Sequence, residues 1–201
     1  MNTPTHIVIS IAALSRSPRD DRETQPTTYF LPAVMGAVLP DAAMYVFYGV
    51  EKFIVGSSER VIWSTQYYLP AWQNVFDWFN SVPVCLIALL AALRWGKRAW
   101  AVLFASMLLH IVCDFPLHHD DGHRHFWPLS DWRFESPVSY WDPHHYGIYA
   151  AAAEMVLFAI CYAIAMRRHR RILYRVLLSA MAVMYALMMI GYFAYVLSRE
   201  T

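Results

Sequence analysis

Five long apolar segments constrain this chain more than any other feature. They cover residues 29–50, 81–95, 99–117, 147–166 and 172–197 of the 201. A helix needs about 20 mostly apolar residues to cross the hydrocarbon core of a bilayer. Hydrophobic residues make up 58% of the chain and charged residues only 15%, which is too apolar for an ordinary soluble domain. The segments predict an all-α, polytopic membrane helical bundle that forms one domain over residues 1–201.

The second segment is short and reaches spanning length only if its helix begins near Val75. A further apolar run at residues 7–14 is too short to cross, so we expect a short N-terminal helix packed against the bundle. The first residues lack the basic region of a secretory signal peptide, and we expect no cleaved leader. The chain is thus predicted to hold about five membrane-embedded helices plus one short helix.

Basic residues gather in three connections, and such residues favour the cytoplasmic side of a membrane. They are Arg94, Lys97 and Arg98, the arginines within 167–175, and Arg16, Arg19 and Arg22. Alternating spans place all three groups on one side, which predicts a multi-pass protein of the inner, cytoplasmic membrane. The loop at 118–146 then faces outward, and His169 among the arginines is expected to be solvated. A net charge of +1 gives no indication of a nucleic-acid partner.

Seven of the nine histidines lie between His110 and His145, together with five aspartates. Imidazole and carboxylate groups are common ligands of zinc, manganese and iron. Placing them beside an apolar segment costs free energy unless something binds them. The stretch therefore predicts a site for one or two divalent metal ions, with zinc as the expected ion, at a membrane surface.

Three residues inside predicted spans carry the strongest signal. His110 and Asp114 are four residues apart and share one helix face, although Pro116 is expected to kink or end that helix. Asp41 follows Pro40, which interrupts the backbone hydrogen bonds of its helix. All three residues are predicted metal ligands. The alternatives are a hydrogen-bonded His–Asp pair that packs two helices, and a capping or proton-sharing role for Asp41.

The polar residues of the loop supply further candidates. Not all of them can bind one ion, so some are solvated or contact substrate. Asp77, with Asn80 and Ser81 nearby, is as well explained by helix capping as by metal binding. Asp142 lies in a turn beside His144 and His145, and Glu154 either supports the site or reaches outward. The remaining candidates are His118, Asp121, His123 and His125, where His118 extends the face of His110 and Asp114.

Several short motifs, taken in order, resemble the YdjM-like family of membrane-bound metal-dependent hydrolases. They are His6 after Thr5, the triplet Leu39-Pro40-Asp41, the pair His110 and Asp114, and the segments 127–129 and 132–134. Residues 123–130 and 136–143 are closest to a branch of which some members are labelled as cobalamin biosynthesis proteins. No amidotransferase or corrin-binding motif accompanies them. The resemblance covers residues 5–146.

This resemblance implies a distant relationship to zinc-dependent phospholipase C. It adds His6 to the expected ligands and implies a phosphoester substrate, which the location would make a membrane lipid or a lipid-linked compound. One or two bound ions would lower the pKa of a water towards 7, with Asp121 or Asp142 as general base. Members usually carry His-Arg-Gly-x-Thr-His-Ser before the second span, whereas residues 75–81 here contain no histidine. Asp77 or the histidines of 118–125 would have to replace those ligands.

Two other functions stay open at this point. The first is a non-enzymatic membrane metal-binding protein, either a carrier or a sensor. A carrier should distribute its ligands across the depth of the bilayer, whereas these ligands gather towards one side, which favours a surface-facing site. The second is a structural membrane protein with a degenerate site, which the missing histidines favour and the histidine surplus at 118–125 opposes.

Overall fold

The structure is a computed structural model that describes residues 1–15 and 29–200. Within these ranges it is all-helical and contains no β-strand. The predicted basic group of Arg16, Arg19 and Arg22 lies outside the described residues. Five helical stretches are long and apolar enough to cross a membrane, and a shorter apolar helix precedes them. The predicted fold class is therefore confirmed, and the chain has the build of a multi-pass membrane protein.

From α2 onward the elements follow one another with short connections, except at the loop 118–146. The first span joins α2 (Phe30–Gly49) to η1 (Val50–Val55), and α3 (Glu59–Val61) and η2 (Ile62–Gln66) follow it. The second span, as expected, begins before residue 81: it joins α4 (Pro70–Phe79) to α5 (Val82–Arg94). The other elements are α1 (Thr3–Leu14), α6 (Arg98–Asp114), η3 (Phe115–Leu117), η4 (Pro143–His145), α7 (Gly147–Arg168) and α8 (Ile172–Glu200).

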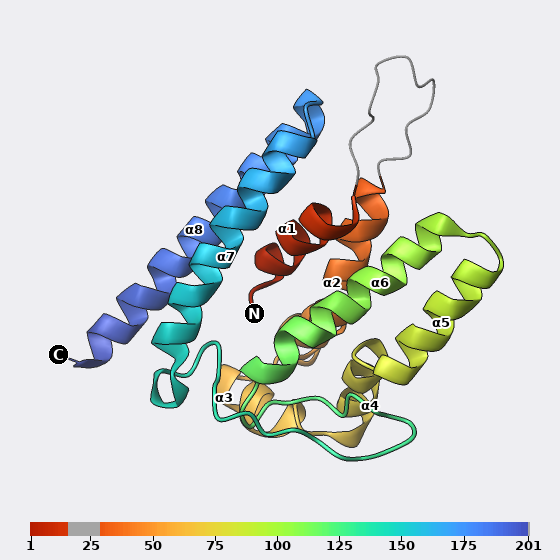
Figure 1. Ribbon diagram of the computed structural model, residues 1–201. Helices are drawn as coiled ribbons and strands as arrows, with labels where there is room; N and C mark the ends of the chain where they lie inside the picture. The colour runs from red at the N-terminus through yellow and green to blue at the C-terminus, as the bar shows by residue number, and fades with distance from the viewer. Residues whose placement is uncertain (16–28, 201) are drawn as a thin grey trace.

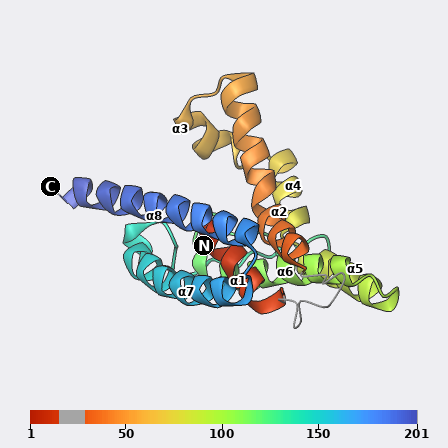
Figure 2. The ribbon, with the colours of Figure 1, turned by 90° about the horizontal axis from the view of Figure 1, so that it is seen from above.

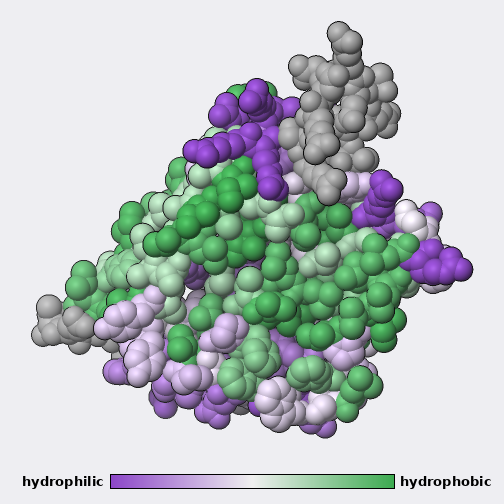
Figure 3. All heavy atoms as spheres, viewed as in Figure 1, coloured by the Kyte–Doolittle hydropathy of each residue, from purple (hydrophilic) through white to green (hydrophobic). Residues whose placement is uncertain are grey.

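The surface agrees with membrane embedding. Figure 3 shows a broad apolar band over the helices, with hydrophilic residues gathered at its two ends. One end carries the connections α5–α6 and α7–α8, which contain the basic residues (Figure 1). The other end carries the loop 118–146, because α6 runs towards that loop and α7 runs away from it. The two described basic connections thus share a side, opposite the loop.

Helix α1 occupies the middle of the molecule. It contacts α2, α6, α7 and α8, and it lies between the α7–α8 pair and the α2–α6 pair (Figure 1). In the view from above, α2 leaves this bundle and carries η1 and α3 on a projecting arm (Figure 2). Apolar side chains on α1, α7 and α8, among them Val8, Phe158 and Leu178, form the largest buried cluster. The short helix predicted at the N-terminus is thus the central packing element.

Small residues let α1, α2 and α6 cross closely. A Cβ atom on Gly36 of α2 would lie 2.2 Å from the carbonyl oxygen of Leu103 and 2.6 Å from Cβ of Ser106, both on α6. The Ser106 hydroxyl donates to the carbonyl oxygen of Ala33 at 2.7 Å and contacts Oγ of Ser10 on α1 at 2.8 Å. This crossing fixes three helices relative to one another, and small residues with hydroxyl contacts are the usual means of close helix packing in membranes.

The loop 118–146 is irregular but closely hydrogen-bonded. Backbone bonds join Ser136 to His118 and Tyr140 to Leu117, so its two halves lie side by side. The hydroxyl of Ser136 also donates to the carbonyl oxygen of Pro116 at 2.6 Å. Helix α6 ends at Asp114, two residues before Pro116, as the sequence predicts. The loop therefore closes over the end of α6 that carries His110 and Asp114.

Candidate metal centre

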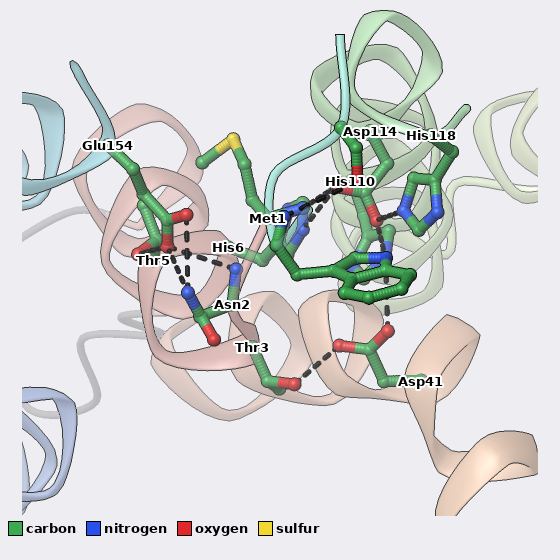
Figure 4. Close-up of polar contacts among 12 residues, drawn as sticks. Met1, Asn2, Thr3, Thr5, His6, Asp41, His110, Asp114, His118 and Glu154 are labelled. Atoms are coloured by element: carbon green, nitrogen blue, oxygen red, sulfur yellow. Dashed lines mark hydrogen bonds and ion pairs between the residues drawn. The ribbon is translucent and has the colours of Figure 1, made fainter. Parts of the chain in front are cut away.

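Three buried side chains from α1 and α6 form a compact group that can hold a metal ion. They are His6, His110 and Asp114, whose ligand atoms all lie within 4.8 Å of one another. Nε2 of His6 is 2.9 Å from Oδ1 of Asp114, and Nε2 of His110 is 3.2 Å from Oδ2 (Figure 4). The two imidazole rings stack with centroids 3.6 Å apart. Two imidazoles and one carboxylate form a common ligand set for catalytic zinc.

The crossing of α1, α2 and α6 positions these side chains. His6 lies one turn before Ser10 on α1, and His110 lies one turn after Ser106 on α6. The contact between the two serines therefore brings both histidines to the same level. Nδ1 of His110 lies 2.8 Å from the carbonyl oxygen of Ala37, so the ring donates there and leaves Nε2 as the ligand atom. Metal-binding histidines are commonly oriented by such a carbonyl.

Asp41 stands beside this group without belonging to it. Its Oδ1 lies 3.6 Å from Nε2 of His110, and its Oδ2 accepts a hydrogen bond of 2.5 Å from the Thr3 hydroxyl. Helix α2 runs through Pro40 without ending, so the proline only perturbs the turn on which Asp41 lies. The Asp41 side chain is 25% exposed, against 1% for His110 and 7% for Asp114. It is therefore the open edge of the centre.

The first residues of the chain surround the group on the other side. The nitrogen of Met1 contacts Oδ1 of Asp114. Glu154 of α7 is buried and accepts hydrogen bonds from the backbone of Asn2 at 3.0 Å and from the Thr5 hydroxyl at 2.6 Å. Glu154 thus ties the start of α1 to α7 and supports the position of His6, and it does not reach outward.

His118 joins the centre to the loop. Its Nε2 lies 3.4 Å from Oδ2 of Asp114 and its Nδ1 lies 3.1 Å from Oδ1 of Asp121. Burial lowers the pKa of His118, but the contacts with the two carboxylates outweigh burial and raise that pKa to about 9. Burial raises the pKa of Asp121, yet His118 and the Trp141 indole hold it below its usual value. Both residues thus favour their charged forms.

Asp77 lies in a different environment from the one a metal ligand needs. It is fully buried, and both of its oxygens bind Arg124, one through the backbone N–H at 2.9 Å and one through Nε at 2.5 Å. The capping interpretation holds for its neighbours, since Asn80 ends α4 and the Ser81 hydroxyl caps α5. The structure therefore places Asp77 outside the compact group, as an anchor for the loop.

His123 and His125 lie near Asp77 and likewise outside the compact group. Nδ1 of His125 donates to the carbonyl oxygen of Asn80 at 3.2 Å. Nδ1 of His123 is 3.9 Å from Asp77 and has no hydrogen-bond partner among the described residues. Burial and the nearby imidazoles of His118 and His125 lower the pKa of His123 to about 3. His123 is therefore neutral at physiological pH.

Asp142 holds the turn at the end of the loop. Its Oδ1 accepts the backbone N–H of His144 at 2.9 Å, and its Oδ2 accepts Nδ1–H of His145 at 2.7 Å. The ring of His145 stacks on His119 with centroids 3.7 Å apart. Both carboxylate oxygens of Asp142 are thus engaged within one turn, which is the structural alternative considered for this residue.

Two features escape the sequence analysis. His169, expected to be solvated, is only 2% exposed and lies 2.7 Å from the Ser15 hydroxyl at the end of α1, so that prediction is wrong. Thr3 and Tyr45 form a hydroxyl chain to Asp41, with 2.6 Å between their oxygens. Asp41 and Tyr45 are one turn apart on α2, but no spacing connects Thr3 to them, because its contacts depend on how α1 crosses α2.

No model of a known protein family, no curated protein and no solved structure matches this chain. The function must therefore be argued from the residues of the centre and from the short motifs in which they occur.

Proposed function

We propose that the protein is a membrane-bound, metal-dependent hydrolase of phosphoesters. The observation that carries this proposal is the convergence of His6, His110 and Asp114 in a buried group that can hold a metal ion. The same three residues, with Asp41, occur in the motifs that resemble YdjM-like hydrolases. Buried histidines and aspartates within membrane segments are costly, and they usually mark functional sites.

The roles of the residues follow from their geometry. His6, His110 and Asp114 hold the ion, for which zinc suits two imidazoles and a carboxylate. When bound, such an ion supplies a Lewis acid that activates water and offsets negative charge on phosphate. Asp41 is the exposed carboxylate of the centre, and we assign it as the group that takes a proton from water. This role replaces the expectation for Asp142, whose oxygens are both engaged elsewhere.

The substrate we propose is a membrane lipid or a lipid-linked phosphoester. Asp41 lies within the span Phe30–Val55, and Tyr45, one turn further along, is 58% exposed. This partly exposed edge on a spanning helix opens the centre towards the bilayer, from which a lipid head group can enter. The shared side of the two basic connections favours their placement in the cytoplasm, with the centre towards the outer face of the inner membrane.

Metal content in detergent-purified protein tests the proposal. We expect the wild type to bind zinc and to release phosphate or head group from phospholipid vesicles. We expect His110→Ala and Asp114→Ala to lose both the zinc and this hydrolysis. His144→Ala is the matched control, because His144 is an exposed loop histidine. Full metal occupancy in His110→Ala would remove the basis of the proposal. Stoichiometric zinc without hydrolysis of any phosphoester offered would indicate a carrier or sensor instead.

A further inference from the structure

A second cluster of potential ligands lies next to the centre, where the loop leaves α6. His118 and Asp121 meet with 3.1 Å between Nδ1 and Oδ1. Despite this distance, neither atom has a hydrogen-bond partner among the described residues, and neither is reached by solvent. Buried polar atoms are rarely left without a partner, and a bound ion is one of the recognised explanations. Packing alone therefore does not explain why these two polar atoms are buried here.

The remaining polar atoms of the two side chains face neighbouring groups, which fixes their orientation. Oδ2 of Asp121 accepts a hydrogen bond from the Trp141 indole at 3.1 Å. Nε2 of His118 faces Oδ2 of Asp114 at 3.4 Å (Figure 4). Nδ1 of His118 and Oδ1 of Asp121 thus face each other, and Nε2 of His118 is likewise without a hydrogen-bond partner among the described residues. Ligand side chains held through their second polar atom in this way are typical of metal sites.

His123 stands where a third ligand is needed. Its ring centroid lies 5.9 Å from that of His118, and the residue is only 9% exposed. Its Nδ1 is buried and unpartnered within the described part of the chain. His123 thus adds a second unexplained buried group to the same place.

The backbone that carries these residues is well supported. The carbonyl oxygen of Asp121 accepts a hydrogen bond of 3.1 Å from the Tyr67 hydroxyl. The next residue, Gly122, packs so closely that an added Cβ would lie 2.9 Å from the carbonyl oxygen of Phe134. The turn between His118 and His123 is therefore held from two sides, as a preorganised ligand site requires.

We propose that His118, Asp121 and His123 bind a second divalent cation adjacent to the first. This inference rests on the proposed function, because the second cation would serve the same phosphoester. His118 connects the two sites, with one edge at Asp114 of the centre and the other at the second cation. A second positive charge here would help to offset the negative charge of a phosphoester bound at the centre. In paired metal sites of hydrolases the ions share the charge of one phosphate.

Metal stoichiometry of purified full-length variants tests this assignment without an activity assay. The probe is zinc, added in excess, then removed by dialysis against a weak chelator before elemental mass spectrometry. We expect two ions per wild-type chain and one in Asp121→Asn or His123→Gln. Asp120→Asn is the matched control, since Asp120 is the exposed carboxylate next in the chain, and it should keep two. Retention of one ion in each site variant would also show that the variant is folded, because a misfolded chain would lose both ions.

Each outcome separates this inference from the proposed function. Two ions retained in Asp121→Asn and His123→Gln would overturn the second site and leave the first intact. If the wild type binds one ion, and that ion is lost in His110→Ala but kept in Asp121→Asn, the second site is likewise overturned and the first stays intact. A single ion lost only in Asp121→Asn would support this site and overturn the centre at His6. No ion in the wild type would overturn both.

Discussion

Two parts of the molecule are rich in histidine and aspartate, and they use these residues differently. At the crossing of α1, α2 and α6, His6, His110 and Asp114 point at one another from two helices. In the loop 118–146, Arg124 and Asp142 use their polar atoms to hold the backbone in place, Arg124 by binding Asp77 of α4. The crossing thus concentrates ligands, whereas most of the loop concentrates structural contacts. His118 and Asp121 stand at the border between the two parts.

The difference shows that a high density of histidine and aspartate along the sequence does not predict which of these side chains meet in the folded protein. Residues 118–125 contain six histidines and aspartates, yet none belongs to the compact group. His6 and Asp114 are 108 residues apart in the sequence, yet Nε2 of His6 lies only 2.9 Å from Oδ1 of Asp114. Neighbouring loop residues point in different directions, while residues on crossed helices can share one point. The crossing therefore brings together residues that are far apart in the sequence.

The largest expected effect on stability comes from Arg124→Ala, which tests the loop half of this comparison. The substitution leaves the carboxylate of Asp77 buried without its guanidinium partner, and breaking such a pair costs about 3–5 kcal/mol. Arg133 lies 3.9 Å from Asp77, so we expect the lower end of that range. Thermal unfolding in detergent, followed by tryptophan fluorescence, measures the loss.

The control for this substitution is Asp131→Ala. Asp131 also pairs with Arg124, at 2.7 Å, but its side chain is 86% exposed. An exposed pair contributes about 0–1 kcal/mol, so we expect little change. Any zinc that the purified protein binds at the proposed centre should remain in both variants. Loss of that zinc in Arg124→Ala without any change in unfolding would show that the loop arginine serves the centre.

Gly36→Ala tests the other half of the comparison, at the crossing. The added Cβ would meet the carbonyl oxygen of Leu103 at 2.2 Å, so α2 must move away from α6. Overpacking of this kind costs about 1–3 kcal/mol. Because the same crossing aligns His6 with His110, we also expect weaker zinc binding in competition with a chelator.

Gly191→Ala is the matched control for Gly36→Ala. Gly191 lies inside α8, and nothing stands within 4 Å of its added Cβ. Alanine favours a helix over glycine by about 1 kcal/mol, so this variant should be neutral or slightly more stable. Equal behaviour of the two variants would mean that the close approach at Gly36 does not position the centre.

The sequence predicts the fold better than the site, for a physical reason. Spanning helices follow from local composition, so all five spans and the short first helix could be predicted. His110 and Asp114 could be paired from their helical spacing, which is also local. The partners of Asp77 could not be predicted, because Arg124 reaches it across 47 residues. The same holds for Ser10 and Ser106, 96 residues apart, whose contact sets the level of the centre.

Asp142→Asn should have the smallest effect on stability, and the dependence of this effect on pH tests the contact between Asp142 and His145. The hydrogen bond from His145 lowers the pKa of Asp142 below its usual value, so the charged carboxylate stabilises the folded turn. A depressed pKa adds stability above the aspartate's unfolded value of about 3.9, and that stability is lost as the pH falls further. The partner side chain is 36% exposed, so we expect only about 0.5 kcal/mol at neutral pH. The difference in unfolding temperature between wild type and variant should vanish in acid.

A different result would change the role of Asp142. If Asp142→Asn lost most phosphoester hydrolysis at neutral pH with unchanged stability, the proton acceptor would be Asp142 in the loop and not Asp41.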